Sequence, residues 1–411
     1  MSAPLDPTPF RGYRSGDAEY LRITLALFFA GVATFATLYS TQAMLPEIAT
    51  AFDIAPGEAT LSLSVATIGL GLALLIAGPL SEAYGRTRLI HLSLTAAPLV
   101  GIGCALAPTW EGLLGLRLLQ GIALAGLPAV ATAYLREELH ATVTARAAGL
   151  YIGGTALGGM TGRLVTAGIG EAAGWQWALG AIALVGLGCA LVVRLLLPAS
   201  RNFTPVQPRL GRLAGLMWGA LKDPALVALY AIGGGGMGAF VAAYNALSFR
   251  LVAEPFGLGL GAVGLVFLVY PVGTIGSIAA GRLAGVFSRR TVMPIASLVL
   301  AAGLLLTVPD NLVAIILGLA VMTGGFFAVH GVASGWVPVR AHAAGIAPGP
   351  AASVYLFAYY LGSSVFGSVA GLVWSGGHWT GVLTLTLTLT GIVIVLSLLL
   401  RRTRPRGEGA R

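Results

Sequence analysis

The chain has 411 residues, of which 57% are hydrophobic and only 9% are charged, and its formal net charge is +9. Soluble globular chains carry about 25% charged and about 45–50% apolar residues, so this composition excludes a water-soluble protein. Residues 341–400 contain no Asp, Glu, Lys or Arg. At about 1.5 Å of rise per residue, such a stretch can cross a roughly 30 Å hydrocarbon layer twice. The sequence therefore predicts an all-α integral membrane protein with many spans.

Several other classes of protein require residues or motifs that this sequence lacks. The two cysteines, Cys104 and Cys189, lie in separate apolar runs, which predicts neither a disulfide framework nor a metal site. The single lysine, Lys222, follows no Gly-rich run, so a Walker A loop is absent, and no common hydrolase motif occurs. We therefore expect no enzyme activity and no cofactor. Residues 1–22 lack the short apolar core of a cleaved signal peptide.

Apolar runs long enough to span a membrane occur twelve times along the chain. They lie near 23–46, 59–82, 89–107, 112–135, 144–166, 175–197, 225–249, 259–282, 292–308, 312–336, 350–373 and 379–400. Turn-forming clusters at 309–311 and 375–378 separate the most closely spaced runs.

The basic residues orient these spans. With the N-terminus inside, 21 of the 24 Lys and Arg residues fall in inner segments, and only Arg250 falls in an outer connection. The remaining two, Arg117 and Arg163, fall within spans. This bias predicts that both termini are cytoplasmic. Because the basic residues flank apolar runs, they indicate membrane orientation and not a nucleic-acid partner.

The sequence also repeats itself at a constant offset of 203 residues. The offset superposes Gln42-Ala43 on Asn245-Ala246, Gly78-Pro79-Leu80 on Gly281-Arg282-Leu283, Arg86 on Arg289 and Gly121 on Gly324. Such a repeat predicts two six-helix domains related by an axis along the membrane normal. The expected organisation is a cytoplasmic tail (1–21), a first six-helix domain (22–197), a cytoplasmic linker (198–223), a second six-helix domain (224–400) and a basic cytoplasmic tail (401–411).

Two motifs resemble signatures of the major facilitator superfamily. Gly78-Pro79-Leu80-Ser81-Glu82-Ala83-Tyr84-Gly85-Arg86-Thr87-Arg88 is similar to the loop between spans two and three, with Glu82 where Asp is usual and Ala83 where a basic residue is usual. Arg117-Leu118-Leu119-Gln120-Gly121 in span four is similar to a signature of proton-coupled members. The resemblance implies the major facilitator fold and transport by alternating access.

Within that superfamily the chain resembles the bacterial acriflavine-sensitivity group of efflux proteins. The similar stretches are Tyr39-Ser40-Thr41-Gln42, Leu45-Pro46, Gly149-Leu150-Tyr151-Ile152, Gly158-Gly159-Met160-Thr161-Gly162-Arg163 and the run 353–364. The resemblance implies a monomer in the bacterial inner membrane that exports a small organic solute in exchange for protons. Drug–proton antiporters usually carry a Gly-Pro pair in span five, whereas 153–159 contains no proline.

Two other functions remain open. Arg117 and Arg163 lie within spans while no Asp or Glu lies deep in any span, which favours uptake or exchange of an organic anion. A non-transporting membrane sensor or assembly protein is the alternative from another class.

The loop between spans two and three supplies the candidate conformational gate, formed by Gly78, Glu82, Gly85, Arg86 and Arg88. An acid among arginines at the inner end of a span can form ion pairs, so we expect a latch that pairs the two domains on the cytoplasmic side. The simpler alternative is that Arg86 and Arg88 only set the topology.

The candidate substrate-binding or coupling residues are polar or aromatic side chains within spans: Gln42, Arg117, Gln120, Asn245, His330, Tyr359 and Tyr360. A guanidinium inside a span costs about 2.5–3.5 kcal/mol, so Arg117 is expected to face a cavity or a partner, the alternative being that it extends outward toward Trp110 and Glu111. Arg163 lies nearer the outer end, where it either extends to the surface or lines the cavity.

His330 is expected to handle protons or contact substrate, or else to be a hydrogen-bonded structural histidine. The corresponding amides Gln42 and Asn245 either bind substrate from both domains or hydrogen-bond between helices. Tyr359 and Tyr360 either stack on a ligand or pack between helices.

Span five contains glycines at small-residue spacing that predict close helix packing. They are Gly149, Gly153, Gly154, Gly158 and Gly162.

Overall fold

The computed structural model describes residues 12–203 and 210–402 and is built from helices. Much of the expected N-terminal tail, part of the linker and nearly all of the C-terminal tail therefore lie outside the described residues. Within the described ranges the only strand-like pairing is an isolated bridge between Tyr13 and Leu139.

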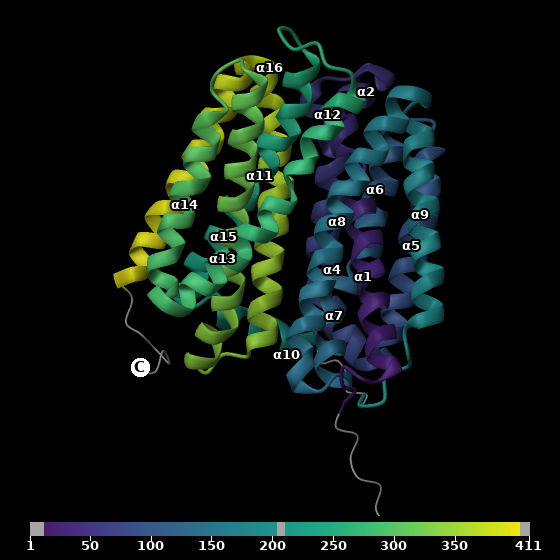
Figure 1. Ribbon diagram of the computed structural model, residues 1–411, viewed down its shortest axis with the longest axis vertical. Helices are drawn as coiled ribbons and strands as arrows, with labels where there is room; N and C mark the ends of the chain where they lie inside the picture. The colour runs from purple at the N-terminus through teal and green to yellow at the C-terminus, as the bar shows by residue number, and fades with distance from the viewer. Residues whose placement is uncertain (1–11, 204–209, 403–411) are drawn as a thin grey trace, which may run out of the picture.

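The first half of the chain forms one bundle, coloured purple to teal in Figure 1. Its helices are α1 (Ala18–Leu38), the 3-10 turn η1 (Gln42–Met44), α2 (Leu45–Phe52), α3 (Pro56–Ala59), α4 (Leu61–Tyr84), α5 (Arg86–Ala105), α6 (Trp110–Leu124), α7 (Gly126–Glu138), α8 (Ala141–Ala173) and α9 (Trp175–Leu196).

The second half forms a separate bundle beside it, coloured green to yellow, and α10 (Leu210–Ala220) lies below and between the two (Figure 1). Its helices are α11 (Pro224–Val252), α12 (Leu260–Leu265), the 3-10 turn η2 (Val266–Val269), α13 (Pro271–Phe287), α14 (Arg289–Leu306), α15 (Leu312–Ala343) and α16 (Pro348–Arg402).

These helices account for the twelve expected spans. Ten segments of the described chain are long and apolar enough to cross a membrane. One of them, α16, has 55 residues and is interrupted at His378, whose φ of 47° and ψ of −146° are not helical. A continuous helix of that length would measure about 80 Å, so α16 makes two spans. The 33-residue α8, which holds Arg163, completes the set.

Two spans are interrupted by a 3-10 turn where their sequences show unbroken apolar runs. The first passes from α1 to α2 through Tyr39 and η1, and the eighth passes from α12 to α13 through η2. Irregular backbone at membrane depth persists only where protein buries it or where it lines a cavity. In transporters such breaks occur at binding sites.

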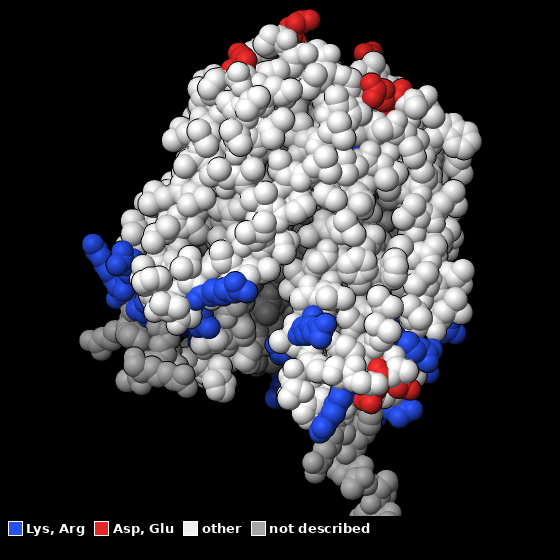
Figure 2. Space-filling view, in the orientation of Figure 1, with Lys and Arg blue, Asp and Glu red and all other residues white. Residues whose placement is uncertain are grey.

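The charged side chains distinguish the two ends of the molecule. Lys and Arg gather at the lower end in Figure 2, where some Asp and Glu lie among them, while the charged side chains visible at the tip of the upper end are Asp and Glu. We call the lower end, with Arg86, Arg88 and Arg340, the basic end, and the upper end, with Glu58 and Asp310, the far end.

The first bundle is closed by a seam of glycines between α8 and α1. A Cβ added at Gly154, Gly158 or Gly162 would clash with the backbone of Phe28, Val32 or Ala36, respectively. The members of each set are four residues apart, which places them on one face of each helix. The close helix packing expected at Gly149 and Gly153 was wrong, because a Cβ at either would meet no atom within 4 Å. These two glycines lie on another face of the same helix.

Candidate functional site

A buried chain of hydrogen bonds joins the two bundles. Arg163 Nε donates to Gln42 Oε1 at 2.6 Å, and Gln42 Nε2 donates to Asn245 Oδ1 at 2.7 Å. Asn245 Nδ2 then donates to the carbonyl oxygen of Gly367 at 3.1 Å. The three side chains are at most 1% exposed. We call Arg163, Gln42 and Asn245 the polar bridge.

The central bond of the polar bridge joins two residues that correspond in the internal repeat, since Gln42 and Asn245 are 203 positions apart. Equivalent residues of two halves can touch only close to the axis that relates those halves. Of the two roles expected for these amides, the structure shows hydrogen bonding between helices. The bridge therefore lies at the centre of the interface.

Arg163 also lies against three aromatic rings at the broken spans. Its guanidinium carbon is 4.2 Å from the ring centroid of Tyr39, 4.5 Å from that of Tyr270 and 5.1 Å from that of Phe267. Cation–π contacts of this kind are stronger in a desolvated site. Of the two positions expected for Arg163, extension to the surface was wrong, because the three rings and the amide of Gln42 hold the side chain inside. The sequence around Arg163, which is rich in glycine, does not reveal these aromatic neighbours.

Other hydrogen bonds between the halves lie near the polar bridge or beyond it toward the far end. Ser248 Oγ donates to the carbonyl of Gln42 at 3.1 Å, and Ser364 Oγ donates to that of Ser64 at 2.8 Å. The amide of Gly261 donates to Glu171 Oε2 at 2.8 Å. In the part of the chain that the structure describes, no hydrogen bond or ion pair joins the bundles at the basic end. The hydrogen bonds between the bundles thus lie at the centre of the interface and toward the far end.

Arg117 lies inside the first bundle, and of the cavity or partner expected for it the structure shows protein partners. It is 0% exposed. It donates from Nη2 to the carbonyl of Leu38 at 2.7 Å, from Nη1 to that of Thr37 at 3.2 Å, and from Nε to that of Ser62 at 2.9 Å. Thr37 and Leu38 end α1, so Arg117 supplies a donor to the carbonyl of Leu38 and a further donor to that of Thr37, which also accepts from Ser40 Oγ at 2.9 Å.

Gln120 completes this network within the same bundle. Its Oε1 accepts a hydrogen bond from Arg117 Nη1, and its Nε2 donates to the carbonyl of Ala97 at 3.1 Å. Both groups of the amide are therefore occupied. We conclude that Arg117 and Gln120 stabilise the break in the first span.

Aromatic side chains of the second bundle surround His330. Its Nδ1 lies 3.0 Å from the hydroxyl of Tyr355, and its ring centroid is 4.6 Å from that of Tyr359. Phe326 stacks on Phe240 at 4.1 Å and lies 6.2 Å from His330. His330 is not among the hydrogen-bond partners of Arg117, which all lie in the first bundle. His330 and Tyr359 are half-buried, and Tyr360 is buried.

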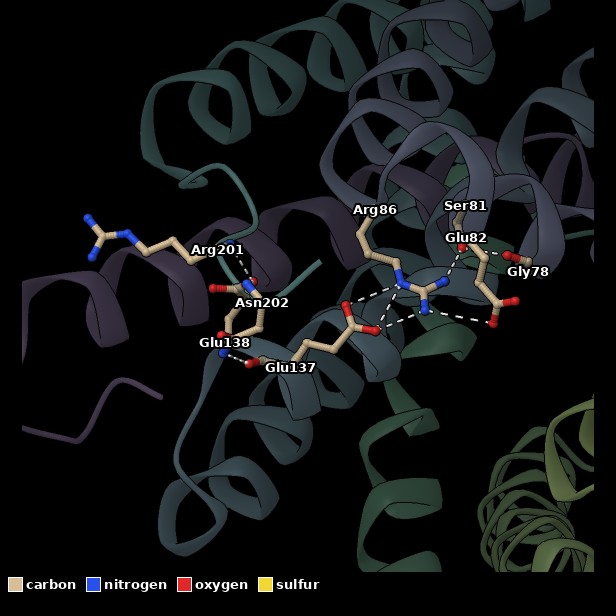
Figure 3. Close-up of polar contacts among 8 residues, drawn as sticks. All are labelled: Gly78, Ser81, Glu82, Arg86, Glu137, Glu138, Arg201 and Asn202. Carbon is tan, nitrogen blue, oxygen red and sulfur yellow. Dashed lines mark hydrogen bonds and ion pairs between the residues drawn. The ribbon is translucent and has the colours of Figure 1, made fainter. Parts of the chain in front are cut away.

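Three of the gate residues, Gly78, Glu82 and Arg86, lie together where α4 ends and α5 begins (Figure 3). Arg86 Nη2 is 2.9 Å from Glu137 Oε1 and 3.8 Å from Glu82 Oε1, and Nη1 donates to Ser81 Oγ. Gly78 accepts a hydrogen bond from Ser81 at its carbonyl. All these partners belong to one bundle, so the expected pairing of the two domains is not formed in this conformation.

The two remaining gate residues lie on either side of the helix junction. Gly85 ends α4 with a φ of 103°, a conformation that favours glycine, and Arg88 is exposed in the first turn of α5. The sequence reading missed Glu137, although the pair Glu137-Glu138 directly after Arg136 is an acidic signal at the end of span four.

The linker is attached to this cluster through the neighbouring acid. Glu138 is 0% exposed, and its Oε1 accepts from the backbone amides of Arg201 at 2.8 Å and Asn202 at 3.2 Å. The side-chain amide of Asn202 donates to the carbonyl of Glu137 at 2.6 Å (Figure 3). The start of the linker is therefore fixed to the helix end that holds Arg86.

At the basic end of the second bundle, Asp223 caps α11. Its Oδ1 accepts from the amides of Ala225 and Leu226, and Arg340 Nη2 lies 2.7 Å from Oδ2. Burial favours a higher pKa for this carboxyl, but the bonds from Arg340 and the two amides outweigh it and lower the pKa of Asp223. Among the described residues no cluster of three His, Cys, Asp or Glu side chains is placed to hold a metal ion.

Two repeat-related helical bundles with broken spans at a central polar site define a membrane transporter. The chain belongs to the Major Facilitator Superfamily, whose family model matches residues 27–250. It is 40% identical to the uncharacterized MFS-type transporter YybF of Bacillus subtilis, over 90% of this chain and 91% of that protein. It is 38% identical to the inner membrane transport protein YnfM of Escherichia coli, over 91% and 89% of the two chains.

Solved structures share the fold at low sequence identity. A bacterial homologue of the human lysosomal transporter Spinster, in an inward-facing and occupied conformation, superposes with a TM-score of 0.72 at 14% identity, over 97% of this chain and 98% of that chain. The xylose transporter XylE from E. coli, in a partially occluded inward open conformation, also gives a TM-score of 0.72 at 14% identity, over 96% and 100%.

Proposed function

We propose that the protein is a secondary active transporter that exports a small organic solute across the bacterial inner membrane in exchange for protons. The polar bridge is the observation that carries this proposal. It joins equivalent points of the two halves at their common axis, so rocking of one bundle against the other must break or remake it. A fixed central site with moving halves is the arrangement that alternating access requires.

The conformation fits one step of that cycle. The bundles are hydrogen-bonded toward the far end, while the ion pairs of Arg86 and Arg340 at the basic end stay within their own bundles. The positive-inside rule makes the basic end cytoplasmic. The conformation is then closed to the outside, and the solute would enter from the cytoplasm.

Coupling to protons needs a group that changes protonation during the cycle. Among the described residues the acids lie near the ends of the spans, which leaves His330 and end acids such as Glu47 or Glu111 as candidates. His330 is the candidate at membrane depth, and its neighbours Tyr355 and Tyr359 come from α16. Moving one charge through 100 mV supplies about 2.3 kcal/mol, enough to concentrate a solute several tens of times.

Transport in proteoliposomes with an imposed pH gradient tests this proposal. We expect solute flux that stops when the gradient is collapsed, together with an opposite proton flux reported by a pH dye. Arg282→Gln, at an exposed position of the basic end, is the control, and His330→Gln should uncouple proton flux from solute flux. Solute binding without flux under any gradient would instead identify a sensor.

Uptake or exchange of an organic anion is the second candidate. The observation that favours it is the guanidinium of Arg163 at the interface with no carboxylate beside it. The same assay separates the two candidates by direction, since exchange would continue without a proton gradient when the solute is present on both sides.

A further inference from the structure

Tyrosine side chains from both bundles line the interface beside Arg163. Tyr39 comes from the break in the first span and Tyr270 from the break in the eighth, and their rings flank the guanidinium at 4.2 and 4.5 Å. From Tyr270 the neighbouring rings of Phe240 and Phe326 lead to Tyr359 of α16, whose ring lies 5.1 Å from that of Tyr360. These tyrosines therefore belong to one aromatic surface that begins at Arg163.

The hydroxyls of these four tyrosines are available for a ligand. In the part of the chain that the structure describes, none of the four makes a hydrogen bond, and none is among the fully enclosed polar atoms that lack a partner. Tyr39 and Tyr270 each keep 6% of their surface accessible, and Tyr359 is half-buried. A buried hydroxyl without a partner costs free energy unless it borders space that water or a ligand can occupy.

Arg163 supplies the charge of this site. Its Nε and Nη1 donate to Gln42 and Gly159, while its Nη2 has no hydrogen-bond partner among the described residues. A guanidinium can present two parallel donors to a carboxylate. Nη2 and the hydroxyls of Tyr39 and Tyr270, whose rings flank the guanidinium, are thus the donors available to an anionic group.

The walls of the site are flat and aromatic. The rings of Tyr359 and His330 are 4.6 Å apart, and the stacked rings of Phe326 and Phe240 continue this surface. Aromatic surroundings alone would also suit a quaternary ammonium ion. Here the rings of Tyr39 and Tyr270 already hold a guanidinium, so a second cation would be repelled at close range in a medium of low dielectric constant.

We propose that this site binds a planar aromatic carboxylate, with the carboxylate held by Arg163 and the tyrosine hydroxyls and the ring held against Tyr359. This inference rests on the proposed transport function and names its substrate class. Because the anion would compete with Gln42 for Arg163, substrate binding would weaken the polar bridge. A membrane potential negative inside would itself favour export of such an anion.

Equilibrium binding to the purified full-length protein in nanodiscs tests the substrate class without any gradient. The probes are benzoate, benzyl alcohol, benzyltrimethylammonium and cyclohexanecarboxylate. The first three share a benzene ring and differ in charge, and the fourth keeps the carboxylate of benzoate on a ring that is not aromatic. We expect benzoate to bind at least tenfold more tightly than each of the other three. Arg163→Gln should weaken benzoate binding about tenfold to a hundredfold and leave benzyl alcohol unchanged.

Tyr359→Phe and Tyr359→Leu separate the hydroxyl from the ring. We expect a loss of a few fold for Phe and a larger loss for Leu, in protein that elutes and melts like the parent. Preference for the ammonium probe, equal binding of all four, or binding of none would overturn the substrate class. None of those outcomes tests the transport proposal, which is tested separately by gradient-driven flux of other solutes.

Discussion

Arg117 and Arg163 show how two arginines within spans acquire different roles. Arg117 finds its acceptors in carbonyls of its own bundle, whereas Arg163 contacts Gln42 and Tyr39 in its own bundle and the rings of Tyr270 and Phe267 across the interface. The sequence predicts that both must be satisfied, because an unpaired guanidinium in a membrane is costly. It does not reveal which acceptors they find, because those come from spans that are distant in sequence.

Arg117→Gln should destabilise the protein without changing substrate preference. The variant removes charge-assisted hydrogen bonds to three carbonyls, a loss of about 3 kcal/mol in the free energy of unfolding. Arg117→Lys should recover only part of it, since an ammonium lacks the planar arrangement of donors. Thermal melting in detergent measures the effect, with Arg282→Gln as the control. An unchanged melting temperature combined with lost solute binding would contradict this structural role and show that Arg117 binds substrate.

The amide pair illustrates what a repeat can predict. The offset of 203 places Gln42 and Asn245 at equivalent positions, and the structure brings them within 2.7 Å. Equivalence is visible in the sequence, but contact is not, because only residues near the axis meet their counterparts. Glu137 and the aromatic neighbours of Arg163 were missed for a related reason: each becomes informative only beside its partner.

At the scale of helices, the apolar pattern locates the spans but not their breaks. The expected runs 23–46 and 259–282 are continuous in hydropathy, yet each contains a 3-10 turn, η1 or η2. Their apolar side chains suit both straight and broken helices, so tertiary contacts decide the backbone path. The breaks at 309–311 and 375–378, in contrast, were predicted from turn-forming residues.

The glycine seam gives a matched pair of substitutions on one helix. Gly158→Ala places a Cβ against the backbone of Val32 and should cost about 1–3 kcal/mol through displacement of α1. Gly153→Ala meets open space and should be neutral or stabilising by up to about 1 kcal/mol, because alanine favours the helix. Melting curves of the two variants compare them directly. Equal melting temperatures would mean that α8 and α1 are not packed through this face.

At the scale of the whole molecule, the two bundles are joined toward one end and separate at the other. The polar bridge, Ser364 and Gly261 provide hydrogen bonds toward the far end, while the arginine clusters of the basic end each serve one bundle. This asymmetry is a property of one conformation. The internal repeat does not predict it, because the repeat relates the two halves and does not distinguish the two ends of the molecule. Alternating access predicts a second conformation in which the asymmetry is reversed.

Distances between spin labels test this central claim most directly. In protein with Cys104 and Cys189 replaced, one pair of labels at Ala51 and Ala253 reports on the far end, and a second pair at Tyr84 and Val286 reports on the basic end; all four positions are exposed. Asn245→Ala removes the middle of the polar bridge. The account predicts that this substitution lengthens the first distance and shortens the second. Distances that stay constant, or that change in the same direction at both ends, would contradict alternating access about the bridge.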